Sequence, residues 1–260
     1  MRQFRCAVVT GASGGIGLEL AKLLAPRADR LILVARNRER LNEIAAELVS
    51  PRCQVHVMVR DLEQQGAAER LWNEVQQIGV IPDLWVNNAG FGLYGKSLET
   101  SLEREQAMVQ LNCISLLTLT KLAGQAMSKQ GGGTILNLAS VAAFQAGPRM
   151  SVYFASKAFV LSLSEAMDEE CKPLGVRVLA LCPGNTATAF HQVAGTLRVK
   201  AMQKAFQMDA PTVARLALRQ IDKGQRVFVP GFLNRLMVFM SSLLPRRLVV
   251  AISARVLKDS

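Results

Sequence analysis

Short apolar runs alternate with longer amphipathic stretches along the chain, and this alternation constrains the fold more than any other feature. The runs have strand length and lie at 6–10, 30–35, 54–59, 84–88, 134–139, 176–182 and 226–230. Helical patterns lie between or beside them, at 16–25, 37–49, 62–78, 101–129, 151–172 and 211–222. Strands this apolar are typical of a parallel sheet covered on both faces by helices. The pattern predicts one doubly wound α/β domain over residues 1–230, with a C-terminal helical extension at 231–260 packed on or beside it.

The composition narrows the class of partner. Five cysteines lie far apart without a CxxC pair, which suits reduced thiols, and the N-terminus has no signal-peptide pattern, so we expect a cytoplasmic protein. Two histidines without clustered ligands predict no metal site. The net charge of +11 comes without a nucleic-acid reader motif or interleaved aromatic residues, so we do not expect nucleic-acid binding.

A glycine-rich loop follows the first predicted strand and opens the first helix, in the stretch VVTGASGGIGLEL. Gly11, Gly15 and Gly17 are spaced G-x-x-x-G-x-G, which differs from the usual G-x-G-x-x-G. Residues without a Cβ let a backbone turn tightly and approach a pyrophosphate at a helix N-terminus. A glycine-rich turn can also simply connect two elements without binding anything. Its place between a strand and a helix favours a dinucleotide site. A phosphate-binding Walker loop is excluded, because no G-K-[ST] follows.

The end of the second predicted strand bears on the choice of cofactor. An NAD site usually places an acidic residue roughly 20 residues beyond the glycines, where it binds the ribose 2′-hydroxyl. Ala35 and Arg36 stand at that place instead. A guanidinium binds a 2′-phosphate, whereas a carboxylate repels it, so the sequence predicts NADP(H). The alternative is that Arg36 is a solvated charge at a strand end.

A tyrosine and a lysine lie one helical turn apart in the stretch MSVYFASKAF. At this i, i+4 spacing Tyr153 and Lys157 share a helix face, and an ammonium beside a phenol lowers the phenol's pKa. Tyr153 is therefore a candidate acid or base. The plainer alternative is a half-buried tyrosine beside a lysine whose amine reaches solvent.

Five stretches together resemble the short-chain dehydrogenase/reductase family in its common form of about 250 residues. They occur in the family's order, with Ser140 thirteen residues before Tyr153: TGASGGIG (10–17), NNAG (87–90), LNCIS (111–115), YFASK (153–157) and CPGNTAT (182–188). The resemblance extends from residue 6 to about residue 230.

The resemblance implies an oxidoreductase that interconverts a carbonyl and an alcohol. It implies that Tyr153 exchanges the proton, that Ser140 binds the carbonyl oxygen and that Lys157 activates the tyrosine and binds ribose. Asn112 would hold a water molecule of a proton relay. It also implies the cofactor contacts Gly11, Ser13, Gly14, Gly15, Ile16, Gly17, Arg36, Asp61, Leu62, Asn88, Ala89, Gly90, Tyr153, Lys157, Pro183, Gly184, Thr186 and Thr188. Asp61 can equally be the N-cap of the next helix.

The segments expected to line the pocket are apolar. Phe91, Leu93, residues 141–144 and Phe190 favour a lipophilic ketone or aldehyde, such as an acyl or steroid-like carbonyl. The family also implies a homodimer or homotetramer. Two other classes stay open: a non-catalytic NADP-binding regulator or scaffold, and an epimerase or dehydratase acting on a nucleotide sugar. The intact Ser–Tyr–Lys set opposes the first, and the lack of a separate substrate domain opposes the second.

The tail at 232–258 is apolar and basic. Pro245 with Arg246 and Arg247 splits it into two short helix candidates, and its longest uncharged run, 236–245, is far below the roughly 20 residues that span a bilayer. Such segments can lie on an anionic membrane. They can equally cover the substrate pocket or form an oligomer interface, and the sequence leaves the three readings open.

Overall fold

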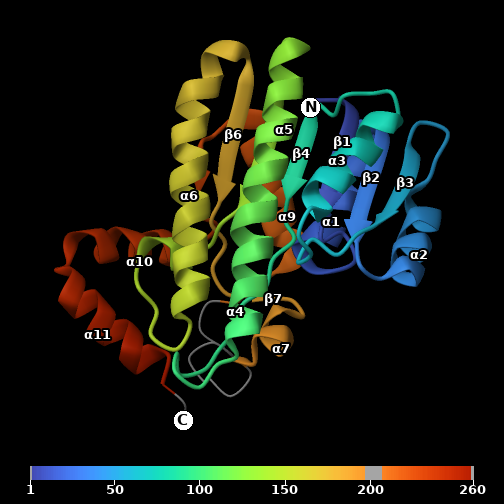
Figure 1. The fold of residues 1–260 in the computed structure, drawn as a ribbon. Coiled ribbons are helices and arrows are strands. Elements are labelled where there is room, and N and C mark those ends of the chain that lie inside the picture. The colour runs from blue at the N-terminus through green and yellow to red at the C-terminus, as the bar shows by residue number, and fades with distance from the viewer. Residues whose placement is uncertain (1, 197–206, 259–260) are drawn as a thin grey trace.

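Seven parallel strands form the centre of the molecule, in the order β3-β2-β1-β4-β5-β6-β9 (Figure 1). The computed structural model describes residues 2–196 and 207–258. The strands are β1 (Phe4–Thr10), β2 (Ala28–Ala35), β3 (Gln54–Val59), β4 (Leu84–Asn87), β5 (Gly133–Leu138), β6 (Val176–Leu181) and β9 (Val227–Phe228). A separate short pair joins β7 (Thr186–Ala187) to β8 (Met208–Asp209).

Helices cover both faces of the sheet, as the apolar strands require. They are α1 (Gly15–Leu24), α2 (Arg38–Leu48), α3 (Ala67–Gln77), α4 (Leu102–Val109), α5 (Leu116–Lys129), α6 (Ser151–Cys171), α7 (Phe190–Ala194), α9 (Ala210–Lys223), α10 (Phe232–Leu243) and α11 (Arg246–Val256). One core packs α1, α2 and α9 against the sheet around Leu33, and a second packs α3, α5 and α6 against the opposite face around Trp85. Figure 1 shows α5 and α6 in front of the sheet and α9 behind it. The predicted doubly wound sheet with a C-terminal helical extension is confirmed.

The observed elements agree closely with those predicted from the sequence, with two exceptions among the predicted helices. The predicted strands differ from those observed by at most two residues at either end. Helix α3 begins at Ala67 instead of residue 62, because Gly66 adopts a left-handed backbone at φ 71° and ends a turn there. The long helix expected at 101–129 is divided by a π-helical turn at Gln110–Ser115, a distortion often found at functional sites.

The strand order reverses direction between β1 and β4, which lie side by side at the centre of the sheet. In open α/β sheets, ligands bind outside the carboxyl ends of the strands at such a switch point. The glycine-rich loop follows β1, and the segment carrying Asn88 follows β4. The topology therefore brings these two predicted site segments together.

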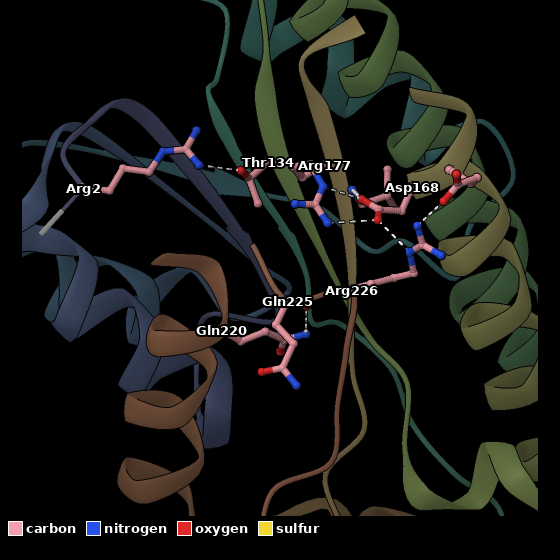
Figure 2. Close-up of polar contacts among 9 residues, drawn as sticks. Arg2, Thr134, Asp168, Arg177, Gln220, Gln225 and Arg226 are labelled. Carbon is pink, nitrogen blue, oxygen red and sulfur yellow. Dashed lines mark hydrogen bonds and ion pairs between the residues drawn. The ribbon is translucent and has the colours of Figure 1, made fainter. Parts of the chain in front are cut away.

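The buried carboxylate of Asp168 connects the elements at the β6–β9 edge of the sheet (Figure 2). Asp168, in α6, is fully buried and accepts hydrogen bonds from the Arg177 guanidinium at 2.8 and 3.0 Å, from Val178 N at 3.0 Å and from Arg226 Nε at 2.8 Å. Burial acts to raise the pKa of Asp168, but the hydrogen bonds from Arg177 and Arg226 outweigh it and lower the pKa. This cluster connects α6, β6 and the short edge strand β9.

Replacing Asp168 with Asn should destabilise the fold by about 2–3 kcal/mol, because Arg177 and Arg226 lose their counter-charge. The cost should stay below the roughly 3–5 kcal/mol of a fully buried pair, since both arginines are partly exposed. Glu169→Gln is the matched control, because Glu169 is exposed and surface pairs contribute less than about 1 kcal/mol.

Urea unfolding of the three proteins measures the difference. Because the folded-state pKa of Asp168 is depressed, its contribution is present above the unfolded pKa of about 4 and is lost as the pH falls through the folded value. The gap between wild type and Asp168→Asn should therefore narrow in acid. Equal unfolding midpoints at neutral pH would contradict the role given to Asp168.

Candidate active site

The glycine-rich loop is shaped by positions that a side chain would disrupt. Gly11 and Gly15 have left-handed backbones, at φ 66° and 56°. A Cβ at Gly17 would lie 2.3 Å from the carbonyl oxygen of Gly11, so the helix and the loop could not approach each other. Ser13 and Ile16 are half-buried between these glycines. The loop thus turns directly from β1 into α1.

The start of α1 is suited to an anion. Gly14 is the N-cap residue and has no side chain with which to cap the helix. The first turn of α1 contains no acidic residue. A Cβ built on Gly14 would meet no atom within 4 Å, so the backbone here borders open space. Free amide groups and the helix dipole at such an end favour a phosphate group. The residues present therefore fit the pyrophosphate of a dinucleotide.

The segment that follows β4 is hydrogen-bonded to the start of the glycine-rich loop. Asn88 Nδ2 donates to the carbonyl oxygens of Thr10 at 2.9 Å and Gly11 at 3.1 Å. The Thr10 hydroxyl in turn accepts from the backbone amides of Asn88 and Ala89, both at 3.0 Å. The Asn88 side chain thus holds the glycine-rich loop in place by hydrogen bonds to the loop's backbone oxygens.

Arg36 lies just after β2 and is largely exposed, with 64% of its side chain accessible. Its guanidinium pairs with Glu63 at 2.6 Å, and Arg104 pairs with the other oxygen of the same carboxylate at 2.9 Å. Two cations thus share one acid, and the group keeps a net positive charge. The pairing with Glu63 was not anticipated from the sequence, although Glu63 lies two residues after Asp61 at the end of β3.

Asp61 and Leu62 lie in the turn between β3 and α3. Asp61 accepts a hydrogen bond from Glu63 N at 3.1 Å, and Leu62 is buried. The N-cap of α3 is Gly66, so the alternative that Asp61 caps this helix is wrong. Asp61 instead stabilises the five-residue turn that delays the start of the helix.

The four predicted catalytic side chains are all buried near the carboxyl end of β5. Ser140 follows the strand, Tyr153 and Lys157 lie on α6, and Asn112 lies in the π-helical turn. The Lys157 amine lies 5.8 Å from the centre of the Tyr153 ring, as expected for neighbours on one helix face. Lys157 Nζ donates to the carbonyl oxygen of Leu138 at 2.8 Å, which fixes the lysine against β5.

The pKa of Tyr153 corrects one expectation. The spacing to Lys157 predicted a lowered pKa, whereas burial raises the pKa of Tyr153 to about 12, with its hydrogen bond to Ser140 opposing the rise. Phe190 covers the Tyr153 ring at 5.2 Å between centroids, and Phe154 packs against its edge. Desolvation thus exceeds any stabilisation of the tyrosinate. Burial also lowers the pKa of Lys157 to about 8.

Asn112 is held by both halves of its amide. Its Nδ2 donates to Phe91 O at 2.9 Å and to Ser156 Oγ at 3.1 Å, and its Oδ1 accepts from Phe91 N at 3.2 Å. A Cβ on Gly90 would lie 3.0 Å from Asn112 Oδ1 and 3.4 Å from Lys157 Nζ, so these two atoms lie near the same glycine. The sequence did not single out Ser156, which lies on the buried side of α6 and accepts the hydrogen bond that helps to orient Asn112.

The segment 183–190 lies over both parts of the site. The Thr188 methyl group is 3.0 Å from where a Cβ of Gly15 would stand, and Pro183 O lies 3.4 Å from the Ser140 hydroxyl that donates to it. Thr186 donates to Gly184 O at 3.1 Å and belongs to β7. The segment 183–190 therefore contacts the glycine-rich loop through Thr188 and the buried Tyr153 ring through Phe190.

The sequence profile of the short-chain dehydrogenase family matches residues 5–196 of the chain. The chain belongs to the short-chain dehydrogenase family. It is 34% identical over 185 residues to an uncharacterized oxidoreductase of Staphylococcus epidermidis, which covers 71% of this chain and 79% of that protein.

Two solved structures of short-chain dehydrogenases and related enzymes resemble the fold closely. A short-chain dehydrogenase from Sphingobium yanoikuyae in complex with NADPH has a TM-score of 0.82 and 28% identity, covering 92% of this chain and 93% of the other. A bulky-bulky ketone specific alcohol dehydrogenase from Comamonas testosteroni has a TM-score of 0.77 and 27% identity, covering 93% and 95%. The chain is accordingly an oxidoreductase of this family, for which a nicotinamide cofactor is expected.

Proposed function

We propose that this short-chain dehydrogenase uses NADP(H) to interconvert a lipophilic carbonyl and the corresponding alcohol. The observation that carries the proposal is the burial of Ser140, Tyr153 and Lys157 together, beside a glycine-rich loop suited to a pyrophosphate. One hydroxyl donor, one phenol and one amine in an apolar setting are the groups that a carbonyl reduction requires.

Each side chain has a role that follows from its chemistry. The Ser140 hydroxyl hydrogen-bonds the carbonyl oxygen, and the Tyr153 phenol gives that oxygen its proton during reduction or removes it from the alcohol during oxidation. Lys157 holds a positive charge near the phenol and binds the ribose next to the nicotinamide. Asn112 supports a proton relay from Lys157. When bound, the nicotinamide supplies or accepts the hydride.

The protonated state of Tyr153 at neutral pH suits the direction of carbonyl reduction, while its burial makes the phenol a weaker acid than a free tyrosine. With burial raising the pKa to about 12, the phenol is protonated at neutral pH and has a proton to donate. The lowered pKa of Lys157, about 8, lies near the working pH, so this amine can pass on protons as well as hold charge.

The apolar surroundings support a lipophilic substrate. Phe190 lies against Tyr153, and Met150 and Phe190 both crowd Gly92 in the loop after β4. The relative from Comamonas testosteroni is described as specific for bulky-bulky ketones. Loss of nicotinamide absorbance during incubation with ketones and aldehydes of increasing size tests the proposal. Turnover that favours small polar carbonyls over lipophilic ones would contradict the substrate class.

The net positive group around Arg36 leads to a prediction about the cofactor. The protein should prefer NADPH over NADH by at least about tenfold in kcat/KM, which is about 1.4 kcal/mol, because the guanidinium attracts a 2′-phosphate. The relative from Sphingobium yanoikuyae was solved with NADPH, which supports the same choice. Arg36→Asp should reverse the preference. Arg52→Gln, an exposed arginine elsewhere, is the control and should leave the ratio unchanged.

Equal use of NADPH and NADH by the unaltered protein would contradict this assignment. A reversed preference in the Arg52→Gln control would show that total charge, instead of Arg36, selects the cofactor. The expected homodimer or homotetramer and the cytoplasmic location stay predictions. Light scattering of the purified protein tests the first, and cell fractionation tests the second.

A further inference from the structure

The two C-terminal helices expose an unusual amount of apolar surface. Eleven of the twenty large hydrophobic side chains exposed in the described part of the chain lie on α10 and α11. They include Phe232, Leu236, Phe239, Leu243, Leu248 and Ile252, and Phe232 and Leu243 are 70% and 63% exposed. A contiguous exposed apolar surface of this kind marks an interaction site.

The helices are attached to the domain by their less apolar side. The buried residue of α10 is Asn234, and those of α11 are Val249 and Ser253, while most of the large apolar side chains of both helices face outward. Asn234 Nδ2 donates to Pro230 O at 2.7 Å and packs so closely on Gly184 that a Cβ there would lie 2.5 Å from its amide. The orientation of α10 is the reverse of that of an ordinary surface helix, which buries its apolar stripe.

The attachment lies beside the proposed substrate pocket. Helix α10 packs on the turn Val141–Phe144, which follows Ser140, with Val238 joining that cluster. At the end of α11, the Tyr94 hydroxyl donates to Leu257 O at 2.5 Å, and Arg149 donates to the same hydroxyl at 3.1 Å. Figure 1 shows α10 and α11 meeting at an angle and projecting from the side of the domain next to α6.

Basic side chains surround this apolar surface. Arg235, Arg246, Arg247, Arg255 and Lys258 are all exposed, and within residues 2–196 and 207–258 none of them forms a salt bridge. The sequence has no acidic residue between Lys223 and Asp259. By contrast, Arg226, which belongs to the same basic run, is neutralised by Asp168 and Glu169. These five cations therefore lie on or next to the projecting helices with no acidic partner among the described residues.

We propose that α10 and α11 dock the protein on the surface of an anionic lipid bilayer. Apolar side chains beside arginines suit the interface of such a membrane, where the side chains enter the acyl boundary and the guanidinium groups meet lipid phosphates. The twelve residues of α10 extend about 18 Å, well short of the roughly 30 Å hydrocarbon core, so the helix lies along the surface and does not span it.

Charge favours a membrane over a second copy of the chain as the occupant. In a symmetric dimer the same patch meets itself, so the interface would hold the arginines of both copies without an acidic residue from α10 or α11 to pair with them. An anionic bilayer instead offers the opposite charge. The long helical stretch 102–129 has the length and composition of a membrane span, but half of its most apolar window is buried within the fold. Membrane contact is thus assigned to α10 and α11 alone.

Vesicle flotation of the full-length protein tests the proposal. The probes are vesicles of pure phosphatidylcholine and vesicles in which about a third of the lipid is phosphatidylglycerol. At roughly 0.01 M salt, where charges act over about 30 Å, the protein should float with the anionic vesicles and much less with the neutral ones. At roughly 1 M salt, where the range falls to about 3 Å, most of this difference should disappear.

Paired variants separate the two contributions. Arg246→Gln with Arg247→Gln should weaken binding to anionic vesicles by at least about tenfold, since each basic residue near the surface contributes about 1 kcal/mol. Phe239→Gln with Leu243→Gln should weaken binding by a similar factor of about ten by removing apolar insertion. The matched controls are Arg52→Gln with Arg219→Gln, and Val49→Gln with Leu174→Gln, all exposed positions outside the tail.

Equal binding to neutral and anionic vesicles, or no binding to either, would overturn the proposal. So would control variants that lose as much vesicle binding as the tail variants. A fourth contradicting result would be a wild-type dimer that the tail variants convert to monomer. The last would assign the surface to a second copy of the chain. Thermal unfolding of every variant, measured by circular dichroism, verifies that each remains folded, so a loss of binding cannot come from a loss of structure.

Discussion

Tyr153→Phe should lower turnover by about two to four orders of magnitude while the protein keeps its fold and its affinity for NADPH. A general acid contributes roughly 10²–10⁴ to the rate, and phenylalanine removes only the hydroxyl that carries the proton. The ring itself, packed between Phe154 and Phe190, is retained, so the core around it should not change. Steady-state kinetics and NADPH titration measure the two quantities.

The other tyrosine provides a matched control. Tyr94→Phe also loses one hydroxyl, but Tyr94 binds the end of α11 and lies outside the proposed chemistry. Its turnover should stay within a few-fold of wild type, a range that a general acid's contribution of about 10² or more exceeds clearly. Near-normal turnover in Tyr153→Phe would mean that another group supplies the proton.

Lys157→Met should have opposite effects on activity and stability. Turnover should fall by about 10²-fold or more, and NADPH should bind more weakly, because a positive charge aimed at the reacting groups is lost. At pH 7, however, the fold should gain on the order of 2 kcal/mol. The buried amine opposes folding, as its lowered pKa of about 8 records, and the lost hydrogen bond to Leu138 O offsets part of the gain.

The pH dependence of stability distinguishes this burial effect from a general improvement in packing. Between the folded pKa of about 8 and the ordinary value of 10.5, the unfolded chain binds more protons at Lys157, so wild-type stability should rise with pH over that window. Lys157→Met should lack the rise. Unfolding by urea at several pH values measures it, with the exposed Lys172→Met as control. A variant less stable than wild type at pH 7 would contradict the burial argument.

The parts of the site that depend on local chain geometry could be predicted from the sequence. Gly11, Gly15 and Gly17 occupy positions where a left-handed backbone or a close contact excludes a side chain. Because glycine is the residue that meets these requirements, its presence in the sequence indicates them. The i, i+4 spacing likewise placed Tyr153 and Lys157 on one helix face.

Features that depend on which elements meet in space could not be predicted. The pairing of Arg36 with Glu63 requires the ends of β2 and β3 to lie side by side, and the spacing of charges along the chain does not reveal it. The raised pKa of Tyr153 arises from its burial, to which residues distant in sequence such as Phe190 contribute. For α10, apolar residues surround the helix on most sides, so the burial of Asn234 was not evident from the sequence.

Transfer of isotope from cofactor to substrate tests the proposed chemistry most directly. The protein is incubated with a lipophilic ketone and NADPH that carries deuterium on the transferable carbon of the nicotinamide, and the alcohol is analysed by mass spectrometry. The account predicts deuterium on the carbinol carbon in wild type and at least about a hundredfold less labelled alcohol in Tyr153→Phe. Bound NADPH without labelled alcohol from any ketone or aldehyde tried would contradict it and favour a non-catalytic NADP-binding protein of the same fold.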